Sequence, residues 1–210
     1  MSADIKRTSV VGGTLKLTAF AAFAALIVAA SWQLTHERIE QNLHTARMAQ
    51  FATVLSGVAF DRIDYDNPEL VSPPHTLPGS TREVRIYRVY QNDAIVAWVF
   101  NVYAAGYSGP IELMVGIDRR QQVTAVRVLS HTETPGLGDD IERSKSDWIA
   151  SFNNQALGDD QADWALRKDG GRFDAFTGAS ITPRAVVIAV RDTLRYAERY
   201  EETLIMEPSE

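Results

Sequence analysis

Three hydroxyl side chains and a glycine come just before a segment that carries the signals of a helix start. Thr177, Ser180 and Thr182 lie within six residues of one another, Gly178 lies between them, and Pro183 follows. Threonine is a good capping residue and proline suits the first helical position, so we expect the helix to begin at Thr182. The backbone amides of a first helical turn lack partners and attract anions. The segment therefore predicts either a phosphate site or an ordinary capping turn.

A second segment with chemical potential runs from His131 to Gly138, directly after a predicted strand. His131 and Glu133 alone are too few for a metal site, because protein metal centres take three or four ligands. The dipeptide Pro135-Gly136 predicts a turn whose backbone comes close to something flat or crowded. The segment therefore favours a binding loop over a metal centre.

The composition narrows the remaining chemistry. Cysteine is absent among the 210 residues and only four histidines occur, which removes disulfides, iron–sulfur clusters, thiolate zinc sites and cysteine nucleophiles. The net charge is -6, and we find no cluster of Lys and Arg of the kind that neutralises phosphates. A nucleic-acid partner is therefore not expected.

Residues 17–35 contain no ionisable group, and as a helix they extend roughly 28 Å, close to the thickness of a bilayer core. A cleavable signal peptide is the alternative, since residues 29–31 are small, but its apolar region usually covers only about 7 to 15 residues. Lys6, Arg7 and Lys16 precede the span, which places the N-terminus in the cytoplasm by the positive-inside rule. We expect an uncleaved single-pass anchor with the rest of the chain outside the cytoplasm.

The other elements follow from periodicity and turn signals, and together they predict an α+β fold. Apolar spacing predicts a helical stalk, a helix with Trp148 and Phe152 on one face, and a last helix along Val187, Val190, Leu194 and Ala197. Four prolines predict an extended, unpaired loop, and alternation predicts two hairpins; the second strand of the first hairpin is apolar on both faces and therefore central. The ranges are 36–56 for the stalk, 67–80 for the loop, 83–91, 94–104, 111–117 and 123–129 for the strands, and 142–156 and 182 onward for the helices.

The sequence Asp174-x-x-Thr177-Gly178-Ala179-Ser180 resembles the flavinylation motif of FMN-binding domains. The resemblance implies that a flavin transferase moves FMN from FAD onto the hydroxyl of Ser180, forming a phosphoester that tethers the flavin. The family more usually has threonine at this position. Thr177 and Thr182 are the alternative hydroxyls.

The segment His131–Gly138 is similar to the His-x-Glu-Thr-Pro-Gly-Leu-Gly stretch of the same family, which lines the flavin site, and the segment Gly106–Ile111 with Val115–Asp118 is similar to a third family segment. With the single span and the stalk, the chain resembles the G component of the Rnf ion-translocating electron transport complexes, called Rsx in some bacteria. The cofactor-binding residues that the resemblance implies are Ser180, Asp174, Thr177, Gly178, Ala179, His131, Glu133, Thr134, Pro135, Gly136, Leu137 and Gly138.

The resemblance also implies a biological setting. It indicates an electron carrier without turnover of its own, in a bacterial inner membrane, with the other membrane subunits of the complex, a flavin transferase and the lipid bilayer as partners. The expected organisation is a cytoplasmic N-terminus at 1–16, a transmembrane helix at 17–35, a stalk and proline-rich loop at 36–80, and a periplasmic FMN-binding domain at 81–210.

Three alternatives stay open on the sequence alone. The chain could be a membrane-anchored scaffold without a cofactor, in which the turn before the last helix is only a cap. It could be the C component of a sodium-translocating NADH:quinone reductase, which is a relative of the Rnf component. The third is a serine hydrolase that uses Ser180 and His131, although the sequence lacks the second glycine of a nucleophile elbow.

Overall fold

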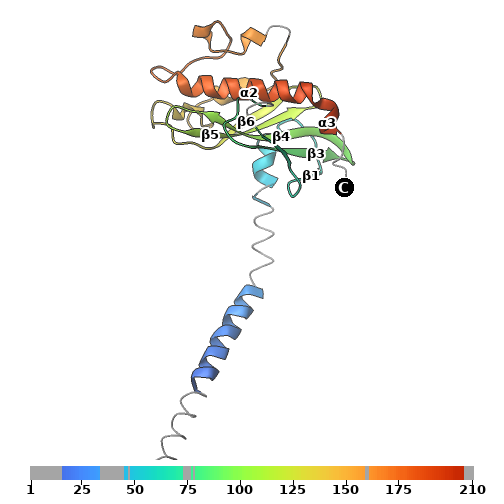
Figure 1. Ribbon diagram of the computed structural model, residues 1–210, viewed down its shortest axis with the longest axis vertical. Helices are drawn as coiled ribbons and strands as arrows, with labels where there is room; N and C mark the ends of the chain where they lie inside the picture. The colour runs from blue at the N-terminus through green and yellow to red at the C-terminus, as the bar shows by residue number, and fades with distance from the viewer. Residues whose placement is uncertain are drawn as a thin grey trace, which may run out of the picture. The chain divides into compact units, whose positions relative to one another are not determined.

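The computed structural model describes residues 16–33, 45–46, 48–72, 77, 79–158 and 161–205. The chain divides into two compact units, residues 1–49 and 50–210. In the first unit, the described residues contain one helix, Lys16–Gln33, that is long and apolar enough to cross a membrane (Figure 1). Its side chains are exposed. This helix agrees with the expected span within two residues. Residues 36–44 and 47 of the expected stalk, and residues 34 and 35 of the expected span, lie outside the described residues.

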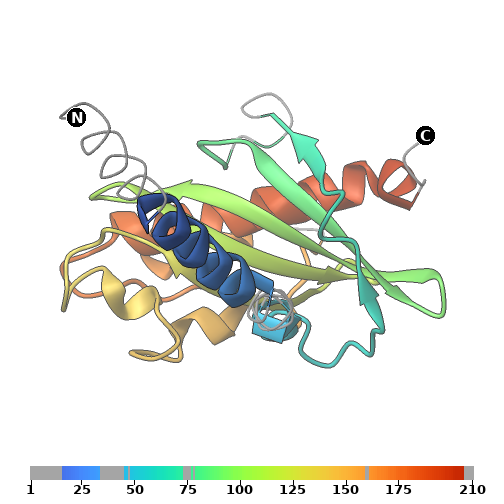
Figure 2. The ribbon, with the colours of Figure 1, turned by 90° about the horizontal axis from the view of Figure 1, so that it is seen from below.

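The second unit is built on an antiparallel sheet, to which the described residues contribute six strands in the order β1-β3-β4-β5-β6, with β2 also paired to β3 (Figures 1 and 2). The strands are β1 Arg62–Ile63, β2 Glu69–Val71, β3 Val84–Gln91, β4 Ala94–Ala105, β5 Pro110–Asp118 and β6 Val123–Ser130. The helices are η1 Asp139–Ile141, η2 Trp148–Phe152, η3 Gln161–Asp163, η4 Arg167–Asp169, α2 Ile181–Arg199 and α3 Glu201–Ile205. The predicted α+β class is confirmed.

The tight turn between β3 and β4 explains the first hairpin. Asn92 and Asp93 both have positive φ, 49° and 60°, the combination that a two-residue turn needs to match the twist of its strands. β4 lies between β3 and β5, and its residues from Ala97 to Val102 are buried on both faces of the sheet. The expectation of a central strand is therefore confirmed.

Helix α2 covers one face of the sheet, as Figure 1 shows. Its apolar positions recur at helical spacing, and they pack into one core with the inward side chains of β4 and β5. Fully buried members of this core include Trp98, Phe100, Leu113, Val190 and Ala197. The predicted last helix is confirmed, and its first residue is Ile181.

The opposite face of the sheet is covered by the segment around residues 51–55. Phe51 packs edge-on against Tyr87 with ring centroids 5.0 Å apart, and the Thr124 hydroxyl donates to the Val54 carbonyl. Gly116 allows this contact, because a Cβ at that position would meet both the Thr124 oxygen and the Val54 carbonyl oxygen at 2.3 Å. The sheet therefore has a second, smaller core, which explains why β4 is apolar on both faces.

The helix predicted at 142–156 is wrong in length and type. Only Trp148–Phe152 is helical, as a 3-10 helix, although the two aromatic rings lie on the same side as expected, 5.3 Å apart. The Ser146 hydroxyl accepts a hydrogen bond from the Trp148 amide, and the Asn154 amide donates to the Val123 carbonyl. Short polar side chains compete with helical backbone bonds, which limits the helix to one short segment.

Two further expectations need correction. The loop at 67–80 is not entirely unpaired, because residues 69–71 form β2 beside β3, directly after Pro68. The helical part of the stalk that the structure describes ends at residue 52, earlier than the expected 56, and a turn follows. Residues 73–76 and 78 of the expected loop lie outside the described residues.

Candidate functional site

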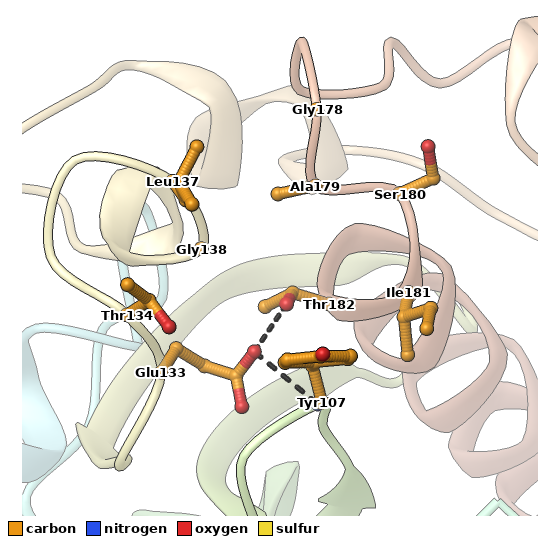
Figure 3. Close-up of a pocket in the computed structure, with 10 residues that line it drawn as sticks. All are labelled: Tyr107, Glu133, Thr134, Leu137, Gly138, Gly178, Ala179, Ser180, Ile181 and Thr182. Carbon is orange, nitrogen blue, oxygen red and sulfur yellow. Dashed lines mark hydrogen bonds between the residues drawn. The ribbon is translucent and has the colours of Figure 1, made fainter.

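A cavity of about 240 Å³ opens where α2 begins, between the helix and the loops at one end of the sheet (Figure 3). Two sets of residues, far apart in the sequence, line it. The loops after β4 and β6 contribute Tyr107, Glu133, Thr134, Leu137 and Gly138, and the segment that enters α2 contributes Gly178, Ala179, Ser180, Ile181 and Thr182.

A tight turn leads into α2 and presents the hydroxyl of Ser180. The Ala179 amide donates to the Phe176 carbonyl, and Gly178 has a φ of +79°, which side chains with a Cβ rarely adopt. Ser180 is the N-cap residue, and its side chain makes no capping hydrogen bond. The hydroxyl is therefore not used to cap the helix, and the amides of Ile181 and Thr182, the first two helical residues, have no partner within the helix.

Thr182 does not cap the helix, contrary to the expectation, because it is the second residue of α2 and its hydroxyl donates to the carboxylate of Glu133. Pro183 accordingly lies at the third helical position rather than the first. The sequence signal identified the right helix end but assigned the hydroxyl to the wrong partner.

Glu133 joins three segments around the cavity. Its side chain is 5% exposed, and it accepts hydrogen bonds from the amides of Ser108 at 2.9 Å and Tyr107 at 3.2 Å, and from the Thr182 hydroxyl. Figure 3 shows Glu133 and Thr182 pointing toward each other across the floor of the cavity. Gly106 makes room for the carboxylate, since a Cβ there would lie 2.5 Å from its oxygen.

A polar network supports the loop that carries Leu137. Asp139 accepts from the Gly136 amide at 2.7 Å and from Lys145 at 2.6 Å, and Lys145 also contacts Glu142. The hydrogen bond from Lys145 lowers the pKa of the Asp139 carboxyl, and hydrogen bonds from Lys145 and then His131 lower the pKa of Glu142. Hydrogen bonds to the two carboxylates raise the pKa of Lys145. The loop is therefore supported by ionised groups.

Residues 106–195 match the family model described as the FMN-binding domain. Three relatives each carry the name of the G component of an ion-translocating oxidoreductase complex. The protein of Escherichia coli O157:H7 is 42% identical over 93% of this chain and 94% of its own, that of Pseudoalteromonas atlantica 40% over 93% and 92%, and that of Vibrio cholerae 39% over 93% and 93%.

The chain belongs to the G-component family of ion-translocating oxidoreductase complexes.

The resemblance seen in the sequence is thereby confirmed, as is the presence of an FMN-binding domain. The cavity lies inside the matched range, since all ten of its lining residues fall between 106 and 195. The two segments that resembled the family's flavin motifs, 131–138 and 174–180, thus meet at one place in the G-component fold.

The structure brings together only part of the residue set that the resemblance implied. Glu133, Thr134, Leu137 and Gly138 line the cavity with Gly178, Ala179 and Ser180. The predicted residues outside the lining are His131, Pro135, Gly136, Asp174 and Thr177.

Several of those outside the lining have structural contacts instead. The Asp174 carbonyl accepts a hydrogen bond from the Trp148 indole at 2.8 Å, and its carboxylate pairs with Arg167 at 2.8 Å. The Trp148 ring also packs edge-on against Phe176, with centroids 5.0 Å apart. Trp148 therefore contacts the residues that precede the turn, Asp174 and Phe176, while Thr177 is exposed at the tip of the turn.

Sequence reasoning did not assign two lining residues, Tyr107 and Ile181. Both are large and exposed, at 71% and 49%, and with Leu137 at 46% they form an apolar rim around the cavity. A single exposed aromatic or aliphatic residue is common on protein surfaces, so only its position beside the cavity marks it. The family segment at 106–111 was the one signal near Tyr107.

The placement of His131 argues against a serine hydrolase that uses it with Ser180. Among the described residues, no group of three or more His, Cys, Asp or Glu side chains could hold a metal ion. His131 is not placed as a base for Ser180, because the Glu133 amide donates to its Nδ1 and its Nε2 faces Glu142 at 3.0 Å. A hydrolase that uses these two residues is therefore not supported.

The residues of the cavity fit a flavin nucleotide. A hydroxyl that makes no capping bond lies beside the unpaired amides of a helix start, which suits a phosphate. The cavity is smaller than typical ligand pockets of about 300 to 1,000 Å³, and the apolar rim lies beside it. When bound, FMN supplies one- and two-electron redox chemistry that the side chains of this protein lack.

Proposed function

We propose that the protein is a membrane-anchored flavoprotein that holds FMN through a phosphoester on the Ser180 hydroxyl and relays electrons within an Rnf-type ion-translocating complex. The observation that carries the proposal is the Ser180 hydroxyl, which makes no capping bond and lines a cavity at the start of α2. The preceding residues Asp174 and Thr177–Ala179 match the family's attachment motif. A serine that merely capped the helix would use its oxygen to accept a hydrogen bond from a backbone amide.

In the proposed attachment reaction, the FMN part of FAD is transferred to the Ser180 hydroxyl and AMP is released. The Ser180 oxygen forms a bond to the flavin-side phosphorus of FAD, the bond from that phosphorus to the bridging oxygen of AMP breaks, and the hydroxyl proton leaves with AMP. A flavin transferase catalyses this step. The Gly178 turn presents the hydroxyl at the surface of the domain, where a transferase can reach it.

The other proposed site residues have supporting roles. Thr134, Leu137 and Gly138 contact the cofactor from the loop after β6, and Gly178 and Ala179 contact it from the turn. Asp174 and Thr177 form the part of the motif that the transferase recognises. His131, Pro135 and Gly136 act indirectly by shaping the loop.

We further propose a single-pass topology in a bacterial inner membrane, with the N-terminus cytoplasmic and the FMN-binding domain periplasmic. Lys6, Arg7 and Lys16 support this orientation. The arrangement gives the ester a physical purpose, because a covalent bond keeps the cofactor on a domain that has left the cytoplasmic FMN pool. The proposed segments are 1–16, 17–35, 36–80 and 81–210.

The proposed partners are the other membrane proteins of the complex, which deliver and receive the electrons, and the lipid bilayer around the span. The names of the relatives support a complex with further components. The protein then acts as a carrier, without a soluble substrate or turnover of its own. The exposed apolar rim lies where a partner can approach the flavin.

The test uses the full chain, co-expressed with a flavin transferase in cells that make FAD. After denaturing electrophoresis, wild type should show a fluorescent band and an added mass equal to FMN minus water. Ser180→Ala should show neither, and Ser180→Thr should keep both. Ser151→Ala is the matched control, because Ser151 is exposed and does not line the cavity.

The outcomes separate the proposal from its rivals. A colourless wild-type protein of unmodified mass contradicts the proposal and favours a scaffold without a cofactor. A label that persists in Ser180→Ala assigns the ester to another hydroxyl, such as Thr177, and contradicts the assignment to Ser180.

A further inference from the structure

The charge of the cavity is unusual for a site that takes a phosphate. Among its ten described lining residues, none is Lys, Arg or His, and the carboxylate of Glu133 is the one acidic group. Proteins that bind free phosphate esters usually surround them with basic side chains as well as amides. The cavity therefore offers a phosphate backbone amides and hydroxyls, but no cation.

Glu133 cannot easily move away from a ligand. Three donors on two different segments hold its oxygens, which is the hydrogen-bond pattern of an ionised carboxylate. The backbone at Gly106 and Gly138 packs closely against Glu133. A Cβ at Gly138 would lie 3.0 Å from the Glu133 Cβ and 3.1 Å from its carboxylate oxygen. The negative charge is thus a fixed part of the cavity floor.

The same carboxylate already occupies the favourable field of the helix. Glu133 bonds to Thr182, the second residue of α2, and so lies at the positive end of the helix dipole. An anion at this end is stabilised by the dipole, and one anion there weakens the attraction for a second. A ligand with two negative charges gains little there and is repelled by the carboxylate.

Covalent attachment changes the charge of the ligand. A free phosphate monoester such as FMN carries about -1.5 to -2 at neutral pH, whereas a diester has one ionisable oxygen left and carries about -1. Given the proposed function, we propose that Glu133 makes the cavity reject free FMN, so that flavin is retained only as the Ser180 diester. Glu133 is then a specificity-determining residue rather than a flavin ligand.

The first test compares two ligands that differ only by the phosphate. Full-length Ser180→Ala protein in detergent is titrated with riboflavin and with FMN, and binding is followed by the change in flavin fluorescence. Riboflavin should bind at least as tightly as FMN. Raising the salt concentration should strengthen FMN binding, because it screens repulsion, and should leave riboflavin binding nearly unchanged.

The second test removes the charge. In the Ser180→Ala background, Glu133→Gln should raise the affinity for FMN relative to riboflavin about tenfold. Glu83→Gln is the matched control, because it removes the same charge from an exposed residue outside the cavity. It should leave the ratio of the two affinities unchanged, which excludes an effect of net charge alone.

Specific results would overturn the inference. Tighter binding of FMN than of riboflavin, weakened by salt, shows an attractive cavity. An equal response to Glu133→Gln and Glu83→Gln shows a general charge effect. If Glu133→Gln does not fold, the inference is decided by the relative affinities of FMN and riboflavin for the Ser180→Ala protein and by the sign of the salt effect on FMN binding. These measurements need no ester, so failure of wild type to become labelled contradicts the proposed function without deciding this inference.

Discussion

A buried charged side chain lies at each of two helix termini, the start of α2, where the cavity opens, and the end of α3, which follows α2 in the chain. At the start of the helix, Glu133 accepts from Thr182 and from two loop amides. Beyond its other end, Arg88 and Trp98 donate to the Leu204 carbonyl of α3, at 3.1 and 3.3 Å. Arg88 also pairs with Glu69 at 2.8 Å.

Each charge suits the helix terminus that it contacts, with the Glu133 carboxylate at the start of α2 and the Arg88 guanidinium at a carbonyl in the last turn of α3. The surroundings differ. Trp98 and Leu204 are fully buried, so their end is packed, whereas glycines replace side chains around Glu133 and leave space beside it. A similar electrostatic arrangement thus serves stability at one end and a binding site at the other.

The largest expected effect tests the packed end. Arg88→Met keeps a long apolar side chain but leaves Glu69 and the Leu204 carbonyl without this donor, and it should lower the free energy of unfolding by about 3 kcal/mol. Urea unfolding of the full chain in detergent, followed by tryptophan fluorescence, measures the change. Flavin attachment at Ser180 should stay at the wild-type level under folding conditions.

An exposed arginine provides the control for this measurement. Arg62 is 52% exposed at its side chain and contacts Asp93 at only 3.9 Å, so Arg62→Met should cost less than about 1 kcal/mol. If Arg88→Met reduced flavin attachment as strongly as it reduced stability, the two ends of α2 would act as one unit, and the comparison would fail.

A smaller effect on stability, with a larger effect on function, is expected at the cavity end. Thr182→Val keeps the shape of the side chain but removes one of three donors to Glu133, which should cost about 1 kcal/mol. Because the carboxylate then loses its link to α2, the yield of the fluorescent band should fall. In-gel fluorescence and thermal unfolding of the same samples measure both quantities.

Thr193→Val is the matched control on the same helix. Its hydroxyl is fully buried and donates to the Ala189 carbonyl at 2.7 Å, away from the cavity. It should alter stability by a similar amount and leave the flavin label intact. Equal labelling of the two variants would show that the Thr182 bond is only structural.

The contrast between the two ends also shows which features can be predicted from the sequence and which cannot. Local signals predicted the hairpin at Asn92-Asp93, the central position of β4 and the apolar face of α2, because each depends on neighbours within a few residues. They also predicted two of the segments that meet at the cavity. The hairpin, the central strand and the helix face follow from periodicity and turn chemistry alone.

The interactions that define the two ends could not be predicted in the same way. Glu133 and Thr182 are 49 residues apart, and Arg88 and Leu204 are 116 apart, so no local pattern encodes either pair. Thr182 carried the signal of a helix cap, but a buried carboxylate competed for its hydroxyl. Only the family segment at 106–111 pointed to the neighbourhood of Tyr107, because the place of this residue on the rim depends on the fold.

The smallest expected effect is a loss of stability in acid at the cavity end of α2, where the Asp139 carboxylate supports the loop. Lys145 lowers the pKa of Asp139 below the ordinary value of 3.8, so the folded state favours the ionised carboxylate. A depressed pKa contributes stability that is complete above the ordinary value and is lost as the pH falls through the lower, folded value. The loop at 134–138 should therefore weaken as the pH falls through this range.

The unfolding temperature, measured between about pH 7 and pH 3, tests this prediction, because the range brackets the ordinary carboxyl pKa. Asp139→Asn should lower the unfolding temperature near neutral pH, because it removes the charged partner of Lys145 while keeping an oxygen that can accept from Gly136, and it should flatten the further loss in acid. Asp147→Asn is the control, because Asp147 is 85% exposed and pairs with the exposed Arg143. If the unfolding temperature falls equally in acid for both variants, Asp139 does not cause the loss of stability. The next candidate is then Glu142, the other carboxylate of this network whose pKa is lowered.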